Sequence, residues 1–218
     1  DVIIPRGGKS LTERVARESR VPVLKHLDGI CHTYIDAAAD PAKALTVTLN
    51  AKMRRVGVCG ATETLLVHRE FLPSLPPILW ALKEGGCLLK GDAAIQALET
   101  GIEAASEEDW GTEYLAPVLS IRAVASVKEA IEHINRYGSH HTDAIITEDS
   151  AAVAAFLAGV DSAIVMHNTS TQFADGGEFG FGAEIGISTD RLHARGPVGA
   201  QHLTTYKYEV TSAGAVRP

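Results

Sequence analysis

Short apolar runs alternate with amphipathic segments along most of this 218-residue chain. Runs typical of buried strands cover residues 2–4, 21–24, 30–36, 61–68, 87–90, 116–124, 143–147 and 162–166. Segments typical of helices lie between them, at residues 11–19, 41–55, 77–83, 127–137 and 150–157, with a short helix from residue 92. This regular alternation predicts an α/β fold with a largely parallel sheet.

Two of the expected helices begin with capping signals. Asp40 precedes Pro41, which places an N-cap carboxylate before a proline at the first helical position. Ser126 and Glu129 have the spacing of a capping box, and that helix ends before Gly138. We therefore expect both helices to start at these residues.

The alternation stops near residue 168. Residues 173–186 are too rich in glycine for a helix or a strand and predict a tightly folded loop. Residues 202–210 then alternate polar and apolar side chains, which predicts an edge strand. The chain also begins on Asp1, inside what reads as a strand, so we expect it to be a piece of a longer protein.

The composition is that of an ordinary soluble globular protein, with 45% hydrophobic and 22% charged residues. A formal net charge of -7 argues against a nucleic-acid partner, and no apolar run is long enough to cross a bilayer. A small anionic ligand stays compatible with this charge, because local arginines and backbone N–H groups bind anions. The three cysteines, Cys31, Cys59 and Cys87, fit no metal motif and predict free thiols in a reducing, cytoplasmic compartment.

Cys59 is the first candidate for chemistry. Gly57 and Gly60 flank it, and small neighbours let a substrate carbonyl and backbone N–H groups approach the sulfur. Arg54 and Arg55 lie just upstream, and nearby cations favour the thiolate form of a cysteine. The spacing alone leaves open the commoner alternative, a buried structural cysteine.

The strings around Cys59 resemble the aldehyde dehydrogenase superfamily. KHLDGICHTYIDAAADPAKA and NAKMRRVGVCGATETLLVH follow the order of that superfamily's segments around its nucleophilic cysteine, and TEYLAPVLSI resembles its Glu-x-Phe-Gly-Pro-Val segment. Within the superfamily, HLDGICH, GVCGATETLLVH, AIEHINRYGSHHTDAI, FGAEIGIST and LHARGPVG are most similar to the γ-glutamyl phosphate reductases. The resemblance covers essentially the whole chain and corresponds to the C-terminal half of that family.

The resemblance implies an activity and a domain organisation. The activity is the NADPH-dependent reduction of L-glutamate 5-phosphate to L-glutamate 5-semialdehyde through a Cys thioester, the second step of proline biosynthesis. The implied domains are the end of a Rossmann-like cofactor domain at residues 1–23, an aldehyde dehydrogenase-like catalytic thiol domain at 24–185, and a return segment with an oligomerisation strand at 186–218. We expect a cytoplasmic homo-oligomer assembled through that C-terminal strand.

The resemblance also carries roles to individual positions. Cys59 matches the thiol nucleophile. Glu113 matches the glutamate that holds the nicotinamide ribose hydroxyls, since the two oxygens of one carboxylate suit a cis-diol. Gly7, Gly8 and Lys9 match the turn beside the phosphate and nicotinamide region of the cofactor. Without the resemblance, Glu113 reads as a solvated loop carboxylate and the Gly-Gly-Lys segment as a plain turn.

His26 stands where aldehyde-oxidising relatives carry a glutamate general base, in Leu-Glu-Leu-Gly-Gly. A reductase must not hydrolyse its thioester, so the loss of that base favours acyl-phosphate chemistry. We assign His26, His141 and Arg195 to substrate binding, because arginine recognises carboxylates and phosphates. The alternatives are a packed structural His26 and a surface pair between Arg195 and Asp190. His140 and His141 predict a hydrogen-bonded corner without a metal, because adjacent histidines diverge on an extended chain.

Other interpretations stay open beside the reductase. One is an aldehyde-oxidising dehydrogenase, and another is a catalytically incomplete piece that serves assembly only. Asp175 and Glu178, in the glycine-rich loop, are further candidates to receive the α-amino group of the substrate.

Overall fold

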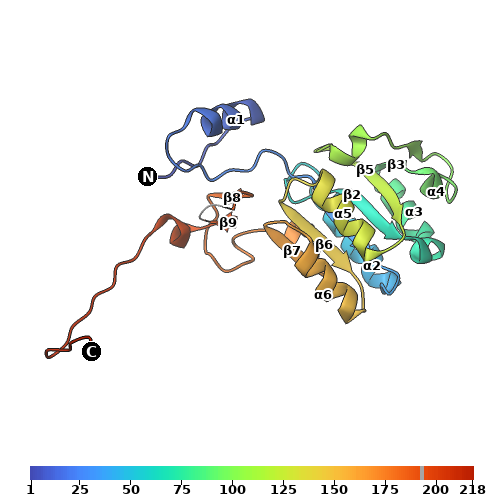
Figure 1. The fold of residues 1–218 in the computed structure, drawn as a ribbon. Coiled ribbons are helices and arrows are strands. Elements are labelled where there is room, and N and C mark those ends of the chain that lie inside the picture. Colours follow the sequence, from blue (N-terminus) through green and yellow to red (C-terminus); the bar gives the residue numbers. More distant parts are fainter. Residues whose placement is uncertain (192–193) are drawn as a thin grey trace.

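A seven-stranded parallel sheet forms the centre of the computed structural model, which describes residues 1–191 and 194–218 (Figure 1). The strands lie in the order β4-β3-β5-β2-β1-β6-β7, and every pairing is parallel. Their bounds are β1 (Cys31–Ile35), β2 (Thr62–His68), β3 (Leu88–Gly91), β4 (Glu103–Ala104), β5 (Val118–Val124), β6 (Thr142–Ile146) and β7 (Ile164–His167). The predicted α/β fold with a parallel sheet is confirmed.

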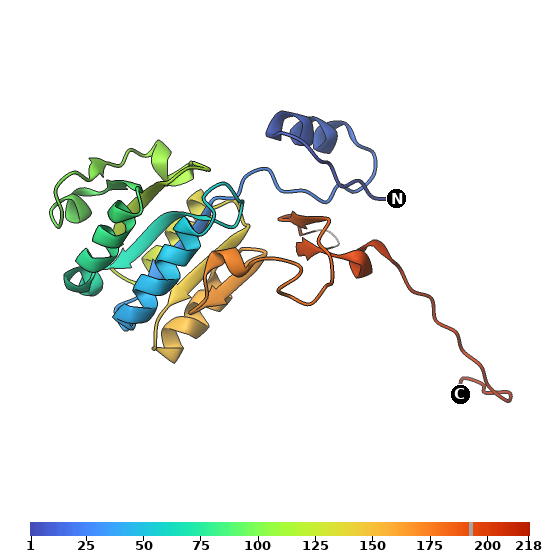
Figure 2. The same ribbon diagram turned by 180° about the vertical axis from the view of Figure 1, so that it is seen from behind.

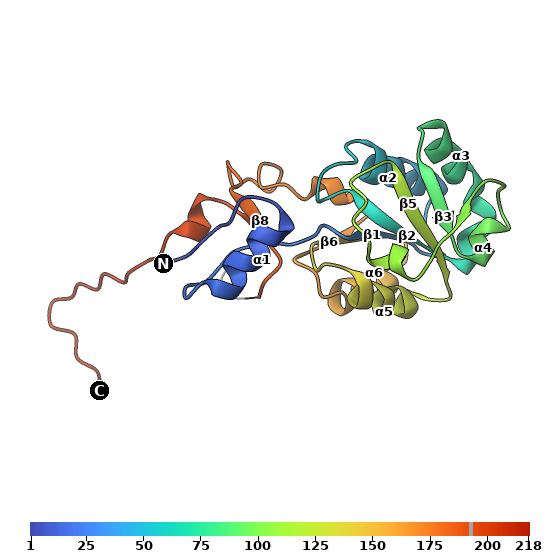
Figure 3. The same ribbon diagram turned by 90° about the horizontal axis from the view of Figure 1, so that it is seen from above.

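Helices cover both faces of this sheet (Figures 2 and 3). One face carries α2 (Pro41–Met53) and α3 (Pro76–Glu84), and the other carries α5 (Val127–Tyr137) and α6 (Ser150–Gly159). Shorter helical segments are α4 (Ala93–Gln96), η1 (Arg69–Ser74), η2 (Glu108–Gly111) and η3 (Thr171–Phe173). None of the helices in residues 1–191 and 194–218 has the length and apolar character needed to span a bilayer.

The alternating side chains of β2 explain why both faces need a helical layer. Leu65 and Val67 are fully buried in the cluster that contains α2 and α3 residues. Leu66, between them, is fully buried in the other cluster, beside Tyr34 and Phe156. Because successive strand residues point to opposite faces, a continuous apolar run such as this one is stable only when the sheet is covered on both sides.

The capping signals also hold in the structure. The Asp40 carboxylate accepts the Lys43 N–H at 2.9 Å, and the Ser126 hydroxyl accepts the Glu129 N–H at 3.2 Å. The Glu129 carboxylate accepts the N–H of Ala125 at 2.7 Å, one residue before the N-cap. The helix start at Ser126 is therefore confirmed, with the return hydrogen bond shifted by one residue from the motif.

A second, smaller body stands beside the sheet and brings the N-terminal segment next to residues 186–203, while the tail that follows runs away from it (Figure 3). It contains α1 (Lys9–Glu18) and the antiparallel pair β8 (Gly186–Ser188) and β9 (Gly196–Val198), followed by η4 (Ala200–Leu203). Leu24 and Val198 pack together in its small apolar cluster, with Val2 and Ile4 against them. The strands expected at residues 2–4 and 21–24 reduce to one bridge between Ile3 and Val23, because this body offers them no wider sheet to join.

The predicted edge strand at residues 202–210 is wrong for the single chain. The chain leaves η4 at Leu203 and runs on without a helix or a strand to residue 218. Tyr206, Tyr208 and Val210 are 79%, 84% and 88% exposed. Alternating side chains favour a strand only where a partner strand supplies backbone hydrogen bonds, and residues 1–191 and 194–218 supply no partner strand for this segment. Leu192 and His193, which open the LHARGPVG string, lie outside the described residues.

Candidate active site

The candidate site lies at the amino-terminal edge of the sheet, where three leading loops meet. Gly29 precedes β1, Cys59 precedes β2, and His141 precedes β6. These strands are direct neighbours in the order β2-β1-β6 and run parallel, so the loops that enter them converge at one edge. Open α/β sheets usually bind ligands at the opposite, carboxyl-terminal edge. Sheet topology alone would therefore point to the wrong edge.

Gly29 and the backbone of Cys59 are in such close contact that only glycine fits. A Cβ atom at residue 29 would lie 2.2 Å from the Cys59 carbonyl oxygen and 2.6 Å from its Cα. On the other side of the cysteine, a Cβ at Gly60 would lie 3.2 Å from the Thr171 carbonyl oxygen. The segment that carries Cys59 is therefore held between the β1 entry and η3, so its backbone position is defined by the fold.

The thiol of Cys59 is a weak acid in this setting. Burial raises its pKa to about 11, and the carboxylates of Glu184 and Glu113 raise it further, while the N–H groups of Cys59 and Gly60 act in the opposite direction. Arg54 and Arg55 are both exposed, and the charged groups that dominate the pKa are carboxylates. The sequence-based expectation that these two arginines favour the thiolate is therefore wrong.

His26 and His141 lie beside the Cys59 sulfur. One ring nitrogen of each histidine and the sulfur all lie within 4.8 Å of one another, and the two rings meet edge to face at 5.3 Å between centroids. Nδ1 of His26 is 3.1 Å from the Ile187 carbonyl oxygen, and Nδ1 of His141 is 2.8 Å from the Thr142 hydroxyl. Burial, followed by the charge of His26, lowers the pKa of His141 to about 3. His141 is therefore neutral at physiological pH.

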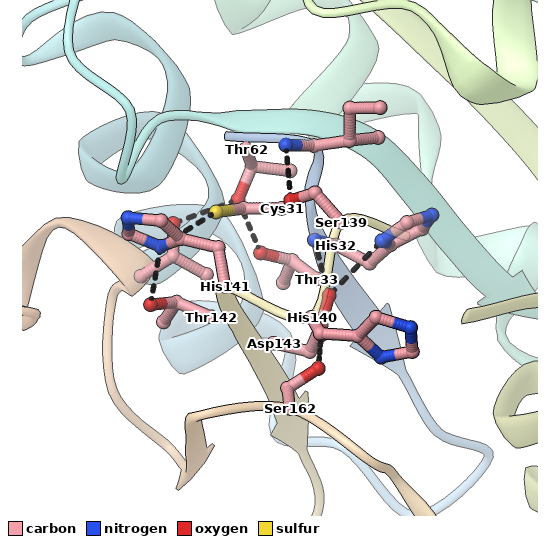
Figure 4. A network of polar contacts seen from close by, with 12 residues as sticks. Cys31, His32, Thr33, Thr62, Ser139, His140, His141, Thr142, Asp143 and Ser162 are labelled. Carbon is pink, nitrogen blue, oxygen red and sulfur yellow. Dashed lines mark hydrogen bonds and ion pairs between the residues drawn. The ribbon is translucent and has the colours of Figure 1, made fainter. Parts of the chain in front are cut away.

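The segment 139–143 forms the expected hydrogen-bonded corner (Figure 4). Asp143, fully buried, accepts the His32 backbone N–H at 2.8 Å and contacts the His32 ring at 3.0 Å, and it also accepts the Ser162 hydroxyl. Ser139 accepts the Ile30 N–H at 2.9 Å. These bonds tie the entry of β1 to the entry of β6, and so they fix the distance between the loops that carry Gly29 and His141.

A cavity of about 340 Å³ opens onto Cys59 and brings several predicted residues together. Gly7, Lys9, His26 and Cys59 all line it, together with Arg6. Gly8 does not line the cavity, but it is the N-cap of α1, and a Cβ there would meet nothing within 4 Å. The Lys9 ammonium pairs with the Asp28 carboxylate at 2.6 Å, which raises the pKa of Lys9. Two cations and a ten-residue helix start at one cavity suit an anionic group.

Glu113 reaches the same neighbourhood from the loop before β5. Its carboxylate accepts the Gly29 N–H at 2.8 Å, and its charge raises the pKa of both Lys9 and Cys59. The loop itself is braced two residues later, where the N–H of Leu115 donates to the buried Glu63 carboxylate at 3.2 Å. The hydrogen bond to Gly29 thus holds the Glu113 carboxylate in a fixed place near the thiol. The sequence without the family resemblance predicts a solvated loop carboxylate at this position.

Arg195 lies apart from the residues that line the Cys59 cavity. Its guanidinium pairs with Asp161 at 3.0 Å, and Arg191 contacts the same carboxylate. The surface partner considered from sequence, Asp190, instead pairs with Lys25 at 2.9 Å. The structure therefore groups Cys59, Glu113, His26, His141 and the residue 7–9 turn at one place, and it leaves Arg195 on a separate ion-pair cluster.

Glu184 is a site residue that sequence reasoning missed. It is the charged group that raises the pKa of Cys59 most, and Arg6 and His26 act on it in turn. Burial raises the pKa of Glu184, and its carboxylate accepts the Gly176 N–H at 2.9 Å. The residue sits inside the FGAEIGIST string, directly after the glycine-rich loop. That string is the sequence signal for Glu184, whereas the carboxylates proposed from the loop composition are Asp175 and Glu178.

Known proteins match this chain in both sequence and structure. The model of the aldehyde dehydrogenase family matches residues 104–188. A gamma-glutamyl phosphate reductase from Rhodospirillum rubrum is 63% identical over 219 residues, which cover 100% of this chain and 51% of that protein. The crystal structure of gamma-glutamyl phosphate reductase from Thermotoga maritima is 45% identical with a TM-score of 0.94, covering 100% of this chain and 53% of that one. The chain thus spans about half the length of these relatives and matches their C-terminal half.

A more distant structure shows the fold alone. Glyceraldehyde-3-phosphate dehydrogenase from Methanocaldococcus jannaschii, solved as a complex with NADP, is 15% identical with a TM-score of 0.66 and covers 87% of this chain and 49% of that one. At this identity the similarity establishes the shared architecture and carries no residue roles.

Proposed function

We propose that this chain, which matches gamma-glutamyl phosphate reductases over its whole length, is the thiol-bearing half of such a reductase and a member of the aldehyde dehydrogenase superfamily. Its substrate is L-glutamate 5-phosphate and its product is L-glutamate 5-semialdehyde, made in the second step of proline biosynthesis. The observation that carries the proposal is the placement of Cys59. Its sulfur faces a cavity that also holds His26, Lys9 and Arg6.

The first chemical step is acyl transfer to the Cys59 sulfur. The thiol proton moves through one water molecule to His26, whose ring nitrogen lies within 4.8 Å of the sulfur, and the thiolate attacks the acyl carbon of the substrate. The C–O bond to phosphate breaks, inorganic phosphate leaves, and a thioester forms on Cys59. The N–H groups of Cys59 and Gly60, which already act on the sulfur, are placed to stabilise negative charge during this step.

His26 is suited to the proton transfer because of its hydrogen bond to the chain. Nδ1 contacts the Ile187 carbonyl oxygen at 3.1 Å, so in the neutral ring Nδ1 carries the proton and Nε2 keeps its lone pair. With a thiol pKa of about 11, the thiolate is scarce at neutral pH, and an adjacent base is needed when the substrate arrives.

The carboxylates near Cys59 each have a partner in the protein. Asp28, next to Gly29, pairs with the Lys9 ammonium at 2.6 Å, the Glu113 carboxylate accepts the Gly29 N–H, and the Glu184 carboxylate accepts the Gly176 N–H. His26 occupies the position at which aldehyde-oxidising relatives carry a glutamate general base, and this replacement favours acyl-phosphate reduction over the alternative, an aldehyde-oxidising dehydrogenase.

The residues around α1 fit a nicotinamide cofactor. Gly8 leaves the start of α1 open, since a Cβ there would meet nothing within 4 Å, and Lys9 and Arg6 add positive charge at the same cavity. We assign Gly7, Gly8 and Lys9 to the phosphate region of NADPH and Glu113 to its ribose. When bound, NADPH supplies the hydride that reduces the acyl group to the aldehyde.

The same proposal extends to organisation. Residues 1–23 are the end of a cofactor-binding domain, 24–185 the thiol domain, and 186–218 a return segment whose C-terminal part pairs with a second copy in a cytoplasmic homo-oligomer. The exposed alternation at Tyr206, Tyr208 and Val210 supports this last role. His141 and Arg195 are assigned to substrate binding; Arg195, which pairs with Asp161 outside the Cys59 cavity, must exchange that carboxylate for a carboxylate or phosphate of the substrate.

Replacement of Cys59 tests the proposal. In the full-length enzyme, Cys59→Ala is expected to abolish acyl-phosphate-dependent oxidation of NADPH, while Cys87→Ala, a buried cysteine elsewhere in the fold, keeps it. Turnover that survives Cys59→Ala would disprove the assignment. A preference for free aldehyde over acyl phosphate in the unmodified enzyme would favour the aldehyde-oxidising alternative.

A further inference from the structure

Three donor atoms of metal-binding type converge at the Cys59 cavity. The Cys59 sulfur and one ring nitrogen each of His26 and His141 lie within 4.8 Å of one another. No metal-binding motif in the sequence links these three residues. The histidines are separated by 115 positions along the chain, and Cys59 lies between them in sequence. The fold alone therefore creates this triad.

The free nitrogen on each ring is Nε2. Nδ1 of His26 faces the Ile187 carbonyl at 3.1 Å, and Nδ1 of His141 faces the Thr142 hydroxyl at 2.8 Å. Nε2 of His141 is fully buried and has no hydrogen-bond partner among the described residues. A buried nitrogen without a partner costs free energy, and a ligand at this point would remove that cost.

The donor set selects the kind of ligand. Two imidazoles and one thiolate are borderline-soft donors, which suit Zn²⁺ and Co²⁺ and disfavour Mg²⁺ or Ca²⁺. In a tetrahedral Zn²⁺ site such donors lie about 3.3–3.6 Å apart, given bond lengths of about 2.0 and 2.3 Å. Closure from 4.8 Å requires a shift of about 1 Å, and His26, which is only partly buried, is the ring that is free to move.

The Nδ1 contacts of both rings orient them for such a site. A metal-bound histidine usually donates a hydrogen bond from its other ring N–H to an oxygen atom, which fixes the ring. The Ile187 carbonyl and the Thr142 hydroxyl are oxygens of this type, at 3.1 and 2.8 Å. Cys59 and His26 both line the cavity, which leaves room for a water molecule as the fourth ligand.

We propose that Cys59, His26 and His141 form a binding site for a transition-metal ion of the Zn²⁺ class, which reversibly blocks the reactive thiol. Binding deprotonates the Cys59 thiol, forms the metal–sulfur bond, and releases the proton to solvent. While the ion is bound, the sulfur has no lone pair free for an acyl group, and His26 has none free for a proton. The site is therefore inhibitory.

The test is a titration of the 218-residue chain with Co²⁺, followed by displacement with Zn²⁺. The expected result is one ion per chain with a thiolate-to-cobalt charge-transfer band that disappears when Zn²⁺ is added. Cys59→Ser is expected to remove the band. His26→Gln and His141→Gln are each expected to weaken binding by more than about 100-fold, because loss of an outer-shell partner alone costs 10–100-fold. Bound Zn²⁺ is also expected to protect Cys59 from alkylation.

Two control variants keep the test specific. Cys87→Ala removes another buried thiol, and His140→Asn removes the histidine next to His141, whose ring faces the Asp161 carbonyl instead. Both are expected to bind Co²⁺ like the unmodified chain. Circular dichroism reports whether His141→Gln folds, and His26→Gln provides the same test at a partly exposed position. A band that is missing in the unmodified chain, or retained in Cys59→Ser or in folded histidine variants, would overturn the proposal.

The readout is metal binding, so it is independent of the reductase assignment. If Cys59→Ala retained turnover in the full-length enzyme, the proposed reaction would fail while the cobalt site stood. If Co²⁺ did not bind and Cys59→Ala abolished turnover, only the metal site would fail.

Discussion

Substitution of Gly29 by alanine tests whether the fold holds Cys59 in place through backbone contact. The added Cβ would lie 2.2, 2.6 and 2.7 Å from the carbonyl oxygen, Cα and carbonyl carbon of Cys59, and Cβ contacts below 3.0 Å essentially do not occur. All three atoms belong to the backbone, so no side-chain rotation relieves the contact. The two segments must separate by at least about 0.8 Å, from 2.2 to 3.0 Å.

The size of the effect follows from this displacement. Overpacking of a tight interior costs about 1–3 kcal/mol, and each kcal/mol lowers the melting temperature by about 2–4 °C in a chain of this size. The Gly29 N–H also donates to Glu113, at 2.8 Å, so the shift disturbs that carboxylate too. A misplacement of about 1 Å at a reacting atom costs about 100-fold in turnover. We expect a stability loss and a much larger loss of activity in the full-length enzyme.

The assay combines thermal unfolding with the rate of Cys59 alkylation by iodoacetamide. Cys31 and Cys87 are buried, so Cys59 is the thiol that a small reagent reaches in the folded chain. The matched control is Gly111→Ala, because a Cβ there would meet nothing within 4 Å. If Gly29→Ala had the melting temperature and alkylation rate of the control, the close contact would not define the position of Cys59, and the reasoning would fail.

Three further predictions use separate parts of the structure. Glu184→Gln removes the charge that most raises the pKa of Cys59, so alkylation at pH 8 is expected to accelerate and its pH profile to move to lower pH; an unchanged profile would contradict this. Lys52→Met leaves the fully buried Glu63 without its cation, which is expected to cost about 3–5 kcal/mol in urea denaturation, most of it recovered when Glu63→Leu is added. Asp109 ionises despite its burial because Lys90 and the Ser106 N–H hold its pKa below the ordinary 3.8. The stabilisation that the ionised Asp109 contributes is present at neutral pH and is lost as the pH falls below about 4. The unmodified chain is therefore expected to lose stability more steeply in acid than the Asp109→Asn variant.

The sequence predicted the sheet and its helices well where local signals agreed with the long-range fold. The helix that starts at Ser126 had a cap, an apolar face and a stop at Gly138, and the structure places α5 at Val127–Tyr137. The strand at 61–68 was an apolar run, and β2 is buried almost throughout. These signals are local, so they can be read without knowledge of the partners.

The site required contacts that no local signal carries. The need for glycine at residue 29 arises from Cys59, thirty residues later, and the ring of His141 meets the ring of His26, which lies far away in sequence. The family resemblance pointed to Cys59 and Glu113, but it did not reveal that carboxylates raise the pKa of the thiol. The strand expected at 202–210 failed for a different reason, because its side chains alternate but the described residues supply no partner strand for it.

The close enclosure of Cys59 also bears on when this sulfur is vulnerable to damage. Its neighbours come from residues 26, 29, 141, 171 and 184, so loops of up to 125 residues (184 − 59) must close before the enclosure exists, and such non-local contacts are slow to form. Until then the thiol keeps its ordinary pKa of 9.0 instead of about 11, which leaves about 100 times more thiolate available to oxidants at neutral pH. Folding thus lowers the thiolate fraction of the nucleophile that it positions, and oxidation of Cys59 is expected to be faster in unfolded chains than in folded ones.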